Sequence, residues 1–204
     1  MADPSDRTLA YYDNHAQAFI DRTANASMDH LYEPFLALVP AGGHILDAGC
    51  GSGRDAAAFA NRGYRVTAFD GSEQMAQLAS QRTGLPVLHM TFDEMNWQEE
   101  FDGVWACASL LHVPFGSLPS VLGRLRRALR PGGVLYVSLK SGDFEGEREG
   151  RWFTDADEKR LSKLLENAEL ELLRIWHSDE TRPCATLTWT NALARRATSH
   201  TSAP

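Results

Sequence analysis

Apolar residues recur along the chain at spacings that alternate between the periods of helices and strands. Within residues 9–20 apolar side chains recur every three to four positions, as on one face of a helix. Residues 101–108 instead form a short apolar run typical of a buried strand. The same pattern predicts helices over 6–19, 27–38, 55–62, 73–82, 118–129 and 154–167. It predicts strands over 44–47, 64–69, 86–88, 101–108, 134–139, 170–177 and 184–192. The expected N-caps are Ser27, Ser72 or Asp70, and Thr154.

The order of these elements predicts an α/β fold. Strands that alternate with helices pair in parallel, whereas the last two strands lack a helix between them and form an antiparallel hairpin at the sheet edge. Residues 143–150 are a charged, glycine-containing loop that is too polar to pack, and residues 151–153 (Arg-Trp-Phe) dock back onto the protein. We expect N-terminal lid helices in residues 1–40, one α/β domain in residues 41–196 and a disordered tail in residues 197–204.

Composition and charge narrow the class of protein. With 204 residues, of which 43% are hydrophobic, the chain suffices for one domain with a sizeable core. The formal charge of −7 repels phosphate backbones and anionic membranes, so we expect neither nucleic acid nor a membrane as partner. Cys50, Cys107 and Cys184 are widely spaced, which favours a reducing compartment. The N-terminus has no apolar signal segment, and we expect a cytoplasmic protein.

A glycine-rich loop follows the first predicted strand. Its acid and glycines are Asp47, Gly49, Gly51 and Gly53. A phosphate-binding P-loop needs Lys and then Ser or Thr after the last glycine, but this chain has Arg54 and Asp55. The dinucleotide pattern G-x-G-x-x-G also fails, because its third glycine falls on Arg54. The next strand ends in Asp70, a carboxylate suited to ribose hydroxyls.

The pattern Asp-x-Gly-x-Gly-x-Gly resembles motif I of the class I S-adenosylmethionine (SAM) dependent methyltransferases. Asp70, Phe101-Asp102, the Pro-Gly-Gly at 131–133 and the terminal hairpin extend the resemblance over residues 44–195. It implies a Rossmann-like seven-stranded sheet of order 3-2-1-4-5-7-6, with strand 7 antiparallel and helices on both faces. Residues 53–55, the short helical lead-in and residues 187–196 give a weaker similarity to the small tellurite-resistance type of methyltransferase.

The resemblance also implies a SAM site. Its candidate residues are Tyr12, Asp47, Gly49, Cys50, Gly51, Gly53, Asp70, Gly71, Met75, Thr91, Phe92 and Cys107. The glycine loop suits the amino-acid end of SAM, with Asp47 near the ammonium, and Asp70 accepts from the ribose hydroxyls. Met75 and Phe92 sandwich the adenine, although Met75 fits a plain core position equally well. Thr91 replaces the acid that relatives often use for the adenine amine.

His112 is the candidate catalytic residue, because it follows the fourth strand at the ligand-binding end of the sheet. Transfer from a sulfonium needs mainly alignment and desolvation, with a base only for poor nucleophiles. His112 can therefore be a general base, line the cleft or make a structural hydrogen bond. Tyr11 and Tyr12 can close over the methionine end, and Trp152 can wall the acceptor pocket, or all three can serve packing alone.

The sequence thus predicts a methyltransferase that uses SAM and acts on a small molecule, as a monomer or homodimer. The chain lacks the Asn/Asp-Pro-Pro-aromatic segment of amino-directed nucleic-acid methylases, and Cys184 in Pro183-Cys184 fits a core position. The seven histidines show no metal-ligand spacing. Two rival functions remain, a SAM-binding module without turnover and a nicotinamide oxidoreductase. The weaker resemblance suggests a chalcogen nucleophile such as tellurite.

Overall fold

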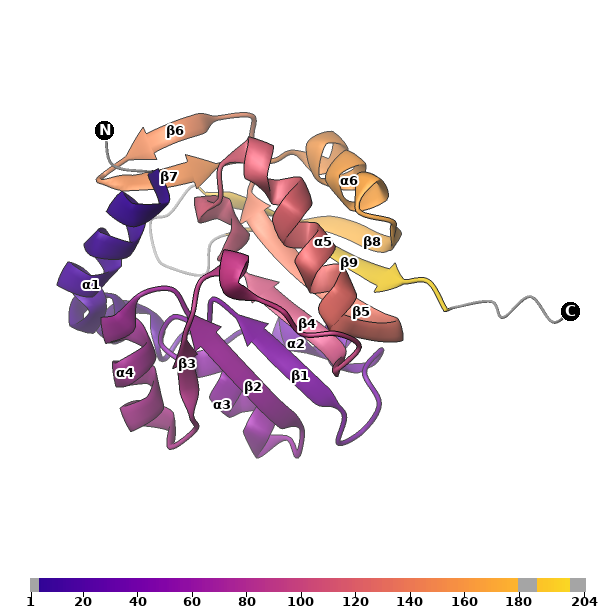
Figure 1. The fold of residues 1–204 in the computed structure, drawn as a ribbon, viewed down its shortest axis with the longest axis horizontal. Helices are drawn as coiled ribbons and strands as arrows, with labels where there is room; N and C mark the ends of the chain where they lie inside the picture. Colours follow the sequence, from indigo (N-terminus) through magenta and orange to yellow (C-terminus); the bar gives the residue numbers. More distant parts are fainter. Residues whose placement is uncertain (1–3, 180–186, 199–204) are drawn as a thin grey trace, which may run out of the picture.

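The computed structural model of the protein describes residues 4–179 and 187–198. Its centre is a seven-stranded sheet (Figure 1). In spatial order the strands are β3 (Val87–His89), β2 (Arg65–Asp70), β1 (His44–Ala48), β4 (Phe101–Cys107), β5 (Leu129–Lys140), β9 (Thr188–Arg196) and β8 (Leu170–Asp179). The first five strands pair in parallel, and β9 is antiparallel to both β5 and β8. The strand order confirms the prediction, and so does the antiparallel strand between the fifth strand and the edge strand of the sheet.

Helices surround the sheet, and a separate two-stranded hairpin lies beyond it. The α-helices are α1 (Pro4–Thr23), α2 (Asp29–Leu36), α3 (Arg54–Asn61), α4 (Glu73–Thr83), α5 (Leu118–Ala128) and α6 (Glu158–Asn167). Three short 3₁₀ turns are η1 (Phe92–Glu94), η2 (Leu110–His112) and η3 (Phe115–Ser117). The hairpin consists of β6 (Glu145–Arg148) and β7 (Arg151–Thr154). Helix α1 packs against α4 and β7.

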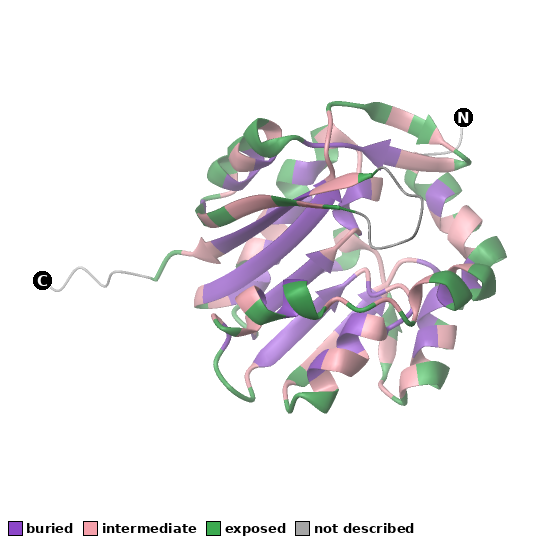
Figure 2. Ribbon diagram, turned by 180° about the vertical axis from the view of Figure 1, so that it is seen from behind, coloured by how far each residue is buried: buried purple, intermediate pink, exposed green. Residues whose placement is uncertain are grey.

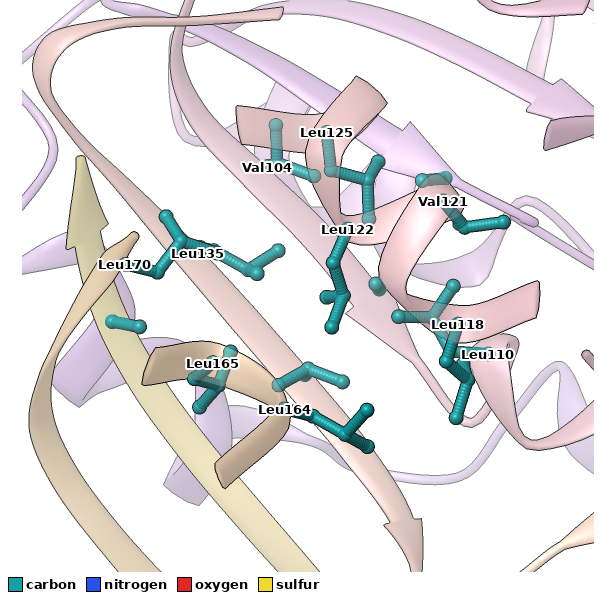
Figure 3. Packing of buried hydrophobic residues seen from close by; sticks show 14 of the residues in the cluster. Val104, Leu110, Leu118, Val121, Leu122, Leu125, Leu135, Leu164, Leu165 and Leu170 are labelled. Carbon is teal, nitrogen blue, oxygen red and sulfur yellow. The ribbon is translucent and has the colours of Figure 1, made fainter. Parts of the chain in front are cut away.

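One face of the sheet is covered by α5 and α6 (Figure 3). Leu118, Val121, Leu122 and Leu125 recur at helical spacing and form the buried stripe of α5. They share a core with Leu164 of α6 and with residues of β4 and β5. The central parallel strands are buried along most of their length (Figure 2), and strands covered on both faces have to be largely apolar.

The opposite face has an aromatic core contributed by α2, α3 and the sheet. Phe35 and Phe59 pack around Trp105, which stacks on Tyr136 with ring centroids 3.8 Å apart. All four residues are buried. The two cores hold β1 and β4 rigidly, so the loops at the carboxyl ends of these strands start from fixed positions.

Some helix and strand starts differ from the prediction. Ser72 caps α4 as expected, because its hydroxyl accepts from Met75 N. Ser27 and Thr154 were wrong as caps: α2 begins after Met28 without a side-chain cap, and α6 is capped by Asp157. The Thr154 hydroxyl instead donates to Val113 O, which keeps this residue in β7.

The predicted loop at 143–150 was also wrong, since part of it forms β6 and pairs with β7. The Pro-Gly-Gly at 131–133 precedes the strand predicted over 134–139 but lies inside β5, where the pairing with β4 shifts register. The final strand begins at Thr188 and extends to Arg196, beyond the predicted end at 192. The predictions for Cys184 and for residues 199–204 lie outside the described residues.

Candidate active site

The glycine loop links β1 to α3 and passes close to the end of β4. Gly49 N and Cys50 N both donate to Phe69 O of β2, which fixes the loop over the neighbouring strand. Gly49 has a φ of +76°, and a Cβ there would lie 2.6 Å from the Ser109 Cβ. Only glycine fits such an approach without displacing the backbone. The loop therefore exposes main-chain groups, not side chains, to whatever lies beside it.

Asp70 ends β2 directly beside this loop. Its Oδ2 accepts from Gly51 N at 2.8 Å, and its Oδ1 accepts from Ser72 N at 3.0 Å. Burial raises the pKa of Asp70, while these two hydrogen bonds lower it. Each carboxylate oxygen has two lone pairs, so Asp70 can still accept from a ligand hydroxyl. Asp70 thus ends the second strand as the sequence predicts, and its role in binding a ribose stays a prediction.

Two cavities meet at the loop. One, of about 530 Å³, is lined by the predicted residues Asp70, Gly71, Met75, Thr91 and Phe92. The other, of about 410 Å³, is lined by Cys50 and Cys107. Both cavities are lined by Tyr12, Phe19, Gly49, Gly51, Ala108 and His112. A ligand with two chemically different ends can therefore span the loop, with one end in each cavity.

Two of the predicted residues line neither cavity. Gly53 precedes α3 with a φ of +69°, and a Cβ there would lie 2.9 Å from Thr83 Cγ2, so its role is in packing α3 against α4. Asp47 is buried in β1, and its Oδ2 has no hydrogen-bond partner within the described residues. Burial and the nearby Asp55 charge raise the pKa of Asp47 well above its ordinary value. An unpartnered buried carboxylate oxygen suits a cationic ligand group or a bridging water.

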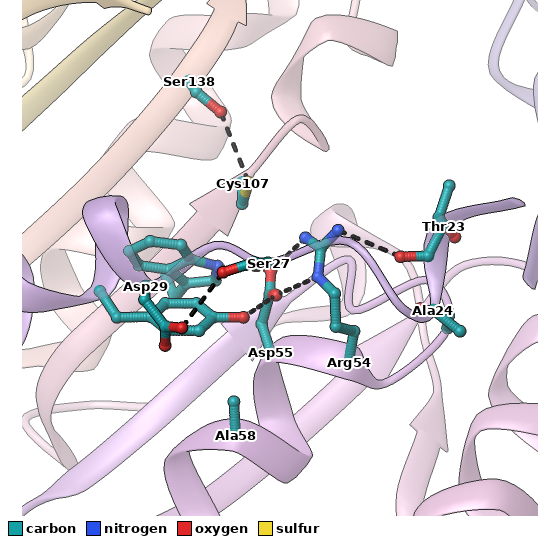
Figure 4. Close-up of polar contacts among 12 residues, drawn as sticks. Thr23, Ala24, Ser27, Asp29, Arg54, Asp55, Ala58, Cys107 and Ser138 are labelled. Carbon is teal, nitrogen blue, oxygen red and sulfur yellow. Dashed lines mark hydrogen bonds and ion pairs between the residues drawn. The ribbon is translucent and has the colours of Figure 1, made fainter. Parts of the chain in front are cut away.

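Asp55 is the centre of a buried network that the sequence reasoning missed (Figure 4). Its carboxylate accepts from Tyr32 Oη at 2.6 Å, from Trp105 Nε1 at 2.8 Å and from the Arg54 guanidinium at 2.6 and 3.0 Å. Burial raises the pKa of Asp55, but the Arg54 charge and these donors outweigh burial and hold the pKa below its ordinary value. Asp55 therefore stays ionised and fixes the start of α3 beside the loop.

Of the two cysteines within the described residues, Cys50 is buried and Cys107 is half-buried. Burial raises the pKa of Cys50 well above its ordinary value and raises that of Cys107 to about 12. The Cys107 Sγ accepts from Ser138 Oγ at 3.7 Å. Neither thiol is a nucleophile at neutral pH, since the thiolate is the reactive form. Both cysteines serve as small wall residues of the cavity.

His112 links α1 to the hairpin. Its Nδ1 lies 2.7 Å from Trp152 O, and because a carbonyl only accepts, Nδ1 carries the proton. The Nε2 atom is then the acceptor for the Tyr12 hydroxyl, 2.8 Å away. Burial lowers the pKa of His112 to about 3, with the Arg151 charge as a further cause. Burial also raises the pKa of Tyr12. Both side chains are therefore neutral near pH 7.

Further contacts tie α1 to the same hairpin. Trp152 N donates to Thr8 Oγ1 at 2.9 Å, and Arg7 forms an ion pair with Glu147 at 2.9 Å. On its other side α1 accepts from the glycine-loop region, because Arg54 donates to Thr23 O. Helix α1 and the hairpin thus form a cover over the place where the two cavities meet.

Two other kinds of site are absent from the described residues. No group of three or more His, Cys, Asp or Glu side chains has the arrangement of a metal site there. Among the same residues, no helix is both long enough and apolar enough to span a membrane.

Comparison with known proteins identifies the class of protein. Residues 45–133 match the methyltransferase domain family. The sheet order, the glycine loop and Asp70 agree with this match. Together with the relatives described below, these features support a class I SAM-dependent methyltransferase domain in this chain.

Individual relatives carry the comparison further. The chain is 31% identical to a malonyl-[acyl-carrier protein] O-methyltransferase of Pectobacterium atrosepticum over 81% of its own length and 62% of that enzyme. It is 40% identical to a trans-aconitate 2-methyltransferase of Paracidovorax citrulli over 51% of its length and 42% of that enzyme. The chain thus spans less than two thirds of these curated relatives.

A solved structure covers more of the chain. The 1,6-didemethyltoxoflavin-N1-methyltransferase of Burkholderia thailandensis, with bound 1,6-didemethyltoxoflavin and S-adenosylhomocysteine, is 26% identical, with a TM-score of 0.73 over 97% of this chain and 92% of that one. The magnesium protoporphyrin IX methyltransferase of Synechocystis, with bound SAM, shares the fold with a TM-score of 0.75 at 18% identity. These matches do not support the finer similarity to the tellurite-resistance type, which stays a prediction.

Proposed function

We propose that this chain transfers a methyl group from SAM to a small-molecule nucleophile. The observation that carries the proposal is the pair of cavities that meet at the glycine loop, one of them containing Asp70. SAM supplies a methyl group on a sulfonium, and attack by a lone pair of the acceptor sends the S–C electron pair to sulfur. The protein must then hold two molecules in line and keep water out.

The residues around the larger cavity fit the adenosine part of SAM. Asp70 has free lone pairs for the ribose hydroxyls, and Phe92 offers a ring for the adenine. Met75 is 1% exposed and packs in the core against Ala16 and Ile20. It also lines the cavity, so it can both fill the core and contact the adenine. Thr91 lines the same cavity, but its hydroxyl already donates to Glu94 Oε2.

The amino-acid end of SAM fits the junction of the cavities. Main-chain groups at Gly49 and Gly51 are approachable there because neither residue carries a side chain. The unpartnered Oδ2 of Asp47 lies in the strand that leads into the loop, and an ammonium group bound nearby, directly or through a water, would favour the ionised carboxylate against the burial that raises its pKa. The unpartnered carboxylate oxygen of Asp47 suits the cationic ammonium group of SAM. It does not suit a nicotinamide dinucleotide, whose pyrophosphate is anionic.

His112 is best explained as a positioning residue. Its Nδ1 proton is committed to Trp152 O, its Nε2 accepts from Tyr12, and burial holds its pKa at about 3. A base with so low a pKa accepts a proton poorly near pH 7. Transfer by alignment and desolvation, without a general base, requires an acceptor that is already a good nucleophile. The cover of α1 and the hairpin supplies the desolvation.

The test is a panel assay that measures release of S-adenosylhomocysteine with candidate acceptors, together with calorimetric titration of SAM and NAD. Binding of SAM with turnover of at least one acceptor is expected. Binding of SAM without any turnover would favour the binding-module alternative, and binding of NAD but not SAM would refute the proposal. The cytoplasmic location stays a prediction that cell fractionation can test. The monomeric or homodimeric state stays a prediction that sedimentation can test.

A further inference from the structure

A cluster of cations surrounds Phe153 at one end of the smaller cavity. The Lys140 Nζ lies 4.0 Å from the ring centroid of Phe153, and the guanidinium carbons of Arg151 and Arg148 lie 5.1 and 5.8 Å from it. Lys140, Arg151 and Phe153 line the cavity itself. The three cations come from the end of β5 and from both strands of the hairpin, so the folded topology alone brings them together.

The local charges of this cluster do not balance. Arg148 forms an ion pair with Asp155 and donates two hydrogen bonds to its carboxylate, of 3.2 and 2.8 Å. Arg151 pairs through one Nη with Glu149, whose side chain is 81% exposed, and a charge pair that solvent reaches is weak. The three cations thus form ion pairs with only two carboxylates, and Asp179, which lines the same cavity, accepts from Thr188 instead, so one of the three cations has no ion-pair partner.

Lys140 carries this unpaired charge. Within the described residues its Nζ forms no hydrogen bond or ion pair, although Asp179 lines the same cavity. The Arg151 Nε is buried and likewise has no acceptor there. Burial lowers the pKa of Lys140, with the Arg148 and Arg151 charges acting in the same direction and Asp155 and Glu149 acting against them. Such an arrangement gains stability when an anion enters.

We propose that the methyl acceptor carries a carboxylate group, which Lys140 and Arg151 bind at the Phe153 end of the smaller cavity. This inference rests on the proposed transferase function. A single uncompensated positive charge matches a monoanion better than a dianionic phosphate. Lys140 offers three donors and Arg151 a free Nε–H, which together satisfy both oxygens of one carboxylate. Phe153 and Trp189 supply apolar walls for the rest of the acceptor.

The test compares acids with their uncharged amides. Protein saturated with S-adenosylhomocysteine is titrated calorimetrically with benzoate, phenylacetate and hexanoate, and with benzamide, phenylacetamide and hexanamide. A charge-assisted hydrogen bond predicts that at least one acid binds roughly tenfold or more tightly than its amide. Lys140→Met should abolish this preference, whereas Lys140→Arg should keep most of it. Lys159→Met, on the exposed surface of α6, is the matched control and should leave the preference unchanged.

The outcomes separate the two proposals. If wild-type protein does not bind S-adenosylhomocysteine, the transferase function fails. If it binds S-adenosylhomocysteine but no acid more tightly than its amide, or if Lys140→Met keeps the preference, only the carboxylate site is overturned. Tighter binding of phenyl phosphate than of benzoate would also overturn it in favour of a phosphate. Circular dichroism checks the fold of each variant, and Arg151→Gln replaces Lys140→Met if the latter does not fold.

Discussion

The neutral state of His112 makes a quantitative prediction about stability against pH. In the folded protein burial lowers the pKa of His112 to about 3, whereas an unfolded chain has a histidine pKa of about 6.5. Between these values the unfolded state binds a proton that the folded state does not. The contribution of His112 to stability is therefore complete above pH 6.5 and is lost as the pH falls toward 3.

The magnitude follows from the same two values. One pKa unit corresponds to about 1.4 kcal/mol, so a drop from pH 7.5 to pH 5 should lower the free energy of unfolding by about 2 kcal/mol through His112 alone. His112→Gln cannot titrate but retains hydrogen-bonding capacity. Contributions from other groups, among them the raised pKa values of Asp47 and Asp70, occur in both proteins and cancel in the difference.

Urea unfolding followed by circular dichroism at pH 7.5 and pH 5 measures this difference. The stability of wild type minus that of His112→Gln should fall by about 2 kcal/mol on acidification. A difference that does not change with pH would refute the reasoning, because it would mean that His112 takes up a proton equally well in the folded state. The NMR signal of the His112 ring, assigned by its loss in the variant, should show no titration above about pH 4.

Three further predictions concern the cofactor site and its cover. Asp70→Ala should weaken SAM binding roughly ten- to a hundredfold in calorimetry, and an unchanged dissociation constant in a folded variant would move the ribose site elsewhere. Gly49→Ala should destabilise the fold in urea unfolding by more than Gly63→Ala, because both residues have positive φ but only Gly49 meets Ser109; equal losses would contradict the close-approach argument. S-adenosylhomocysteine should slow amide exchange in α1 and in the β6–β7 hairpin together, and slowing in neither would mean a preformed cleft.

The sheet could be predicted because its signals are local. The apolar run of each central strand is contained within a few consecutive residues, and so are the glycine loop and the cap at Ser72. Strands buried on both faces have to be apolar, and a helix that packs on them has to repeat at helical spacing. These requirements link sequence to fold without knowledge of distant contacts.

The hairpin and the Asp55 network could not be predicted for the opposite reason. The Glu-Gly-Glu-Arg sequence of β6 has no apolar alternation, and the hairpin is held by contacts with residues far away in sequence, such as that of Glu147 with Arg7. Asp55 meets Tyr32 and Trp105, which lie 23 and 50 residues away along the chain. The only local sign of this network was an acid, Asp55, at the start of an otherwise apolar helix. His112 had three open roles because its partners, Tyr12 and Trp152, are likewise distant in sequence.

The position of β9 has a consequence for how the chain folds. Although β9 follows all the other described strands along the chain, it lies between β5 and β8 and pairs with both. Until residues 188–196 leave the ribosome, the apolar β5 has an open edge and β8 has no strand to pair with. Completion of the sheet should therefore depend on pairings formed late and across many residues, as between Val134 and Arg195. Release of a chain truncated before Thr188 should yield an aggregation-prone species, for which a chaperone that covers unpaired strands is a natural requirement.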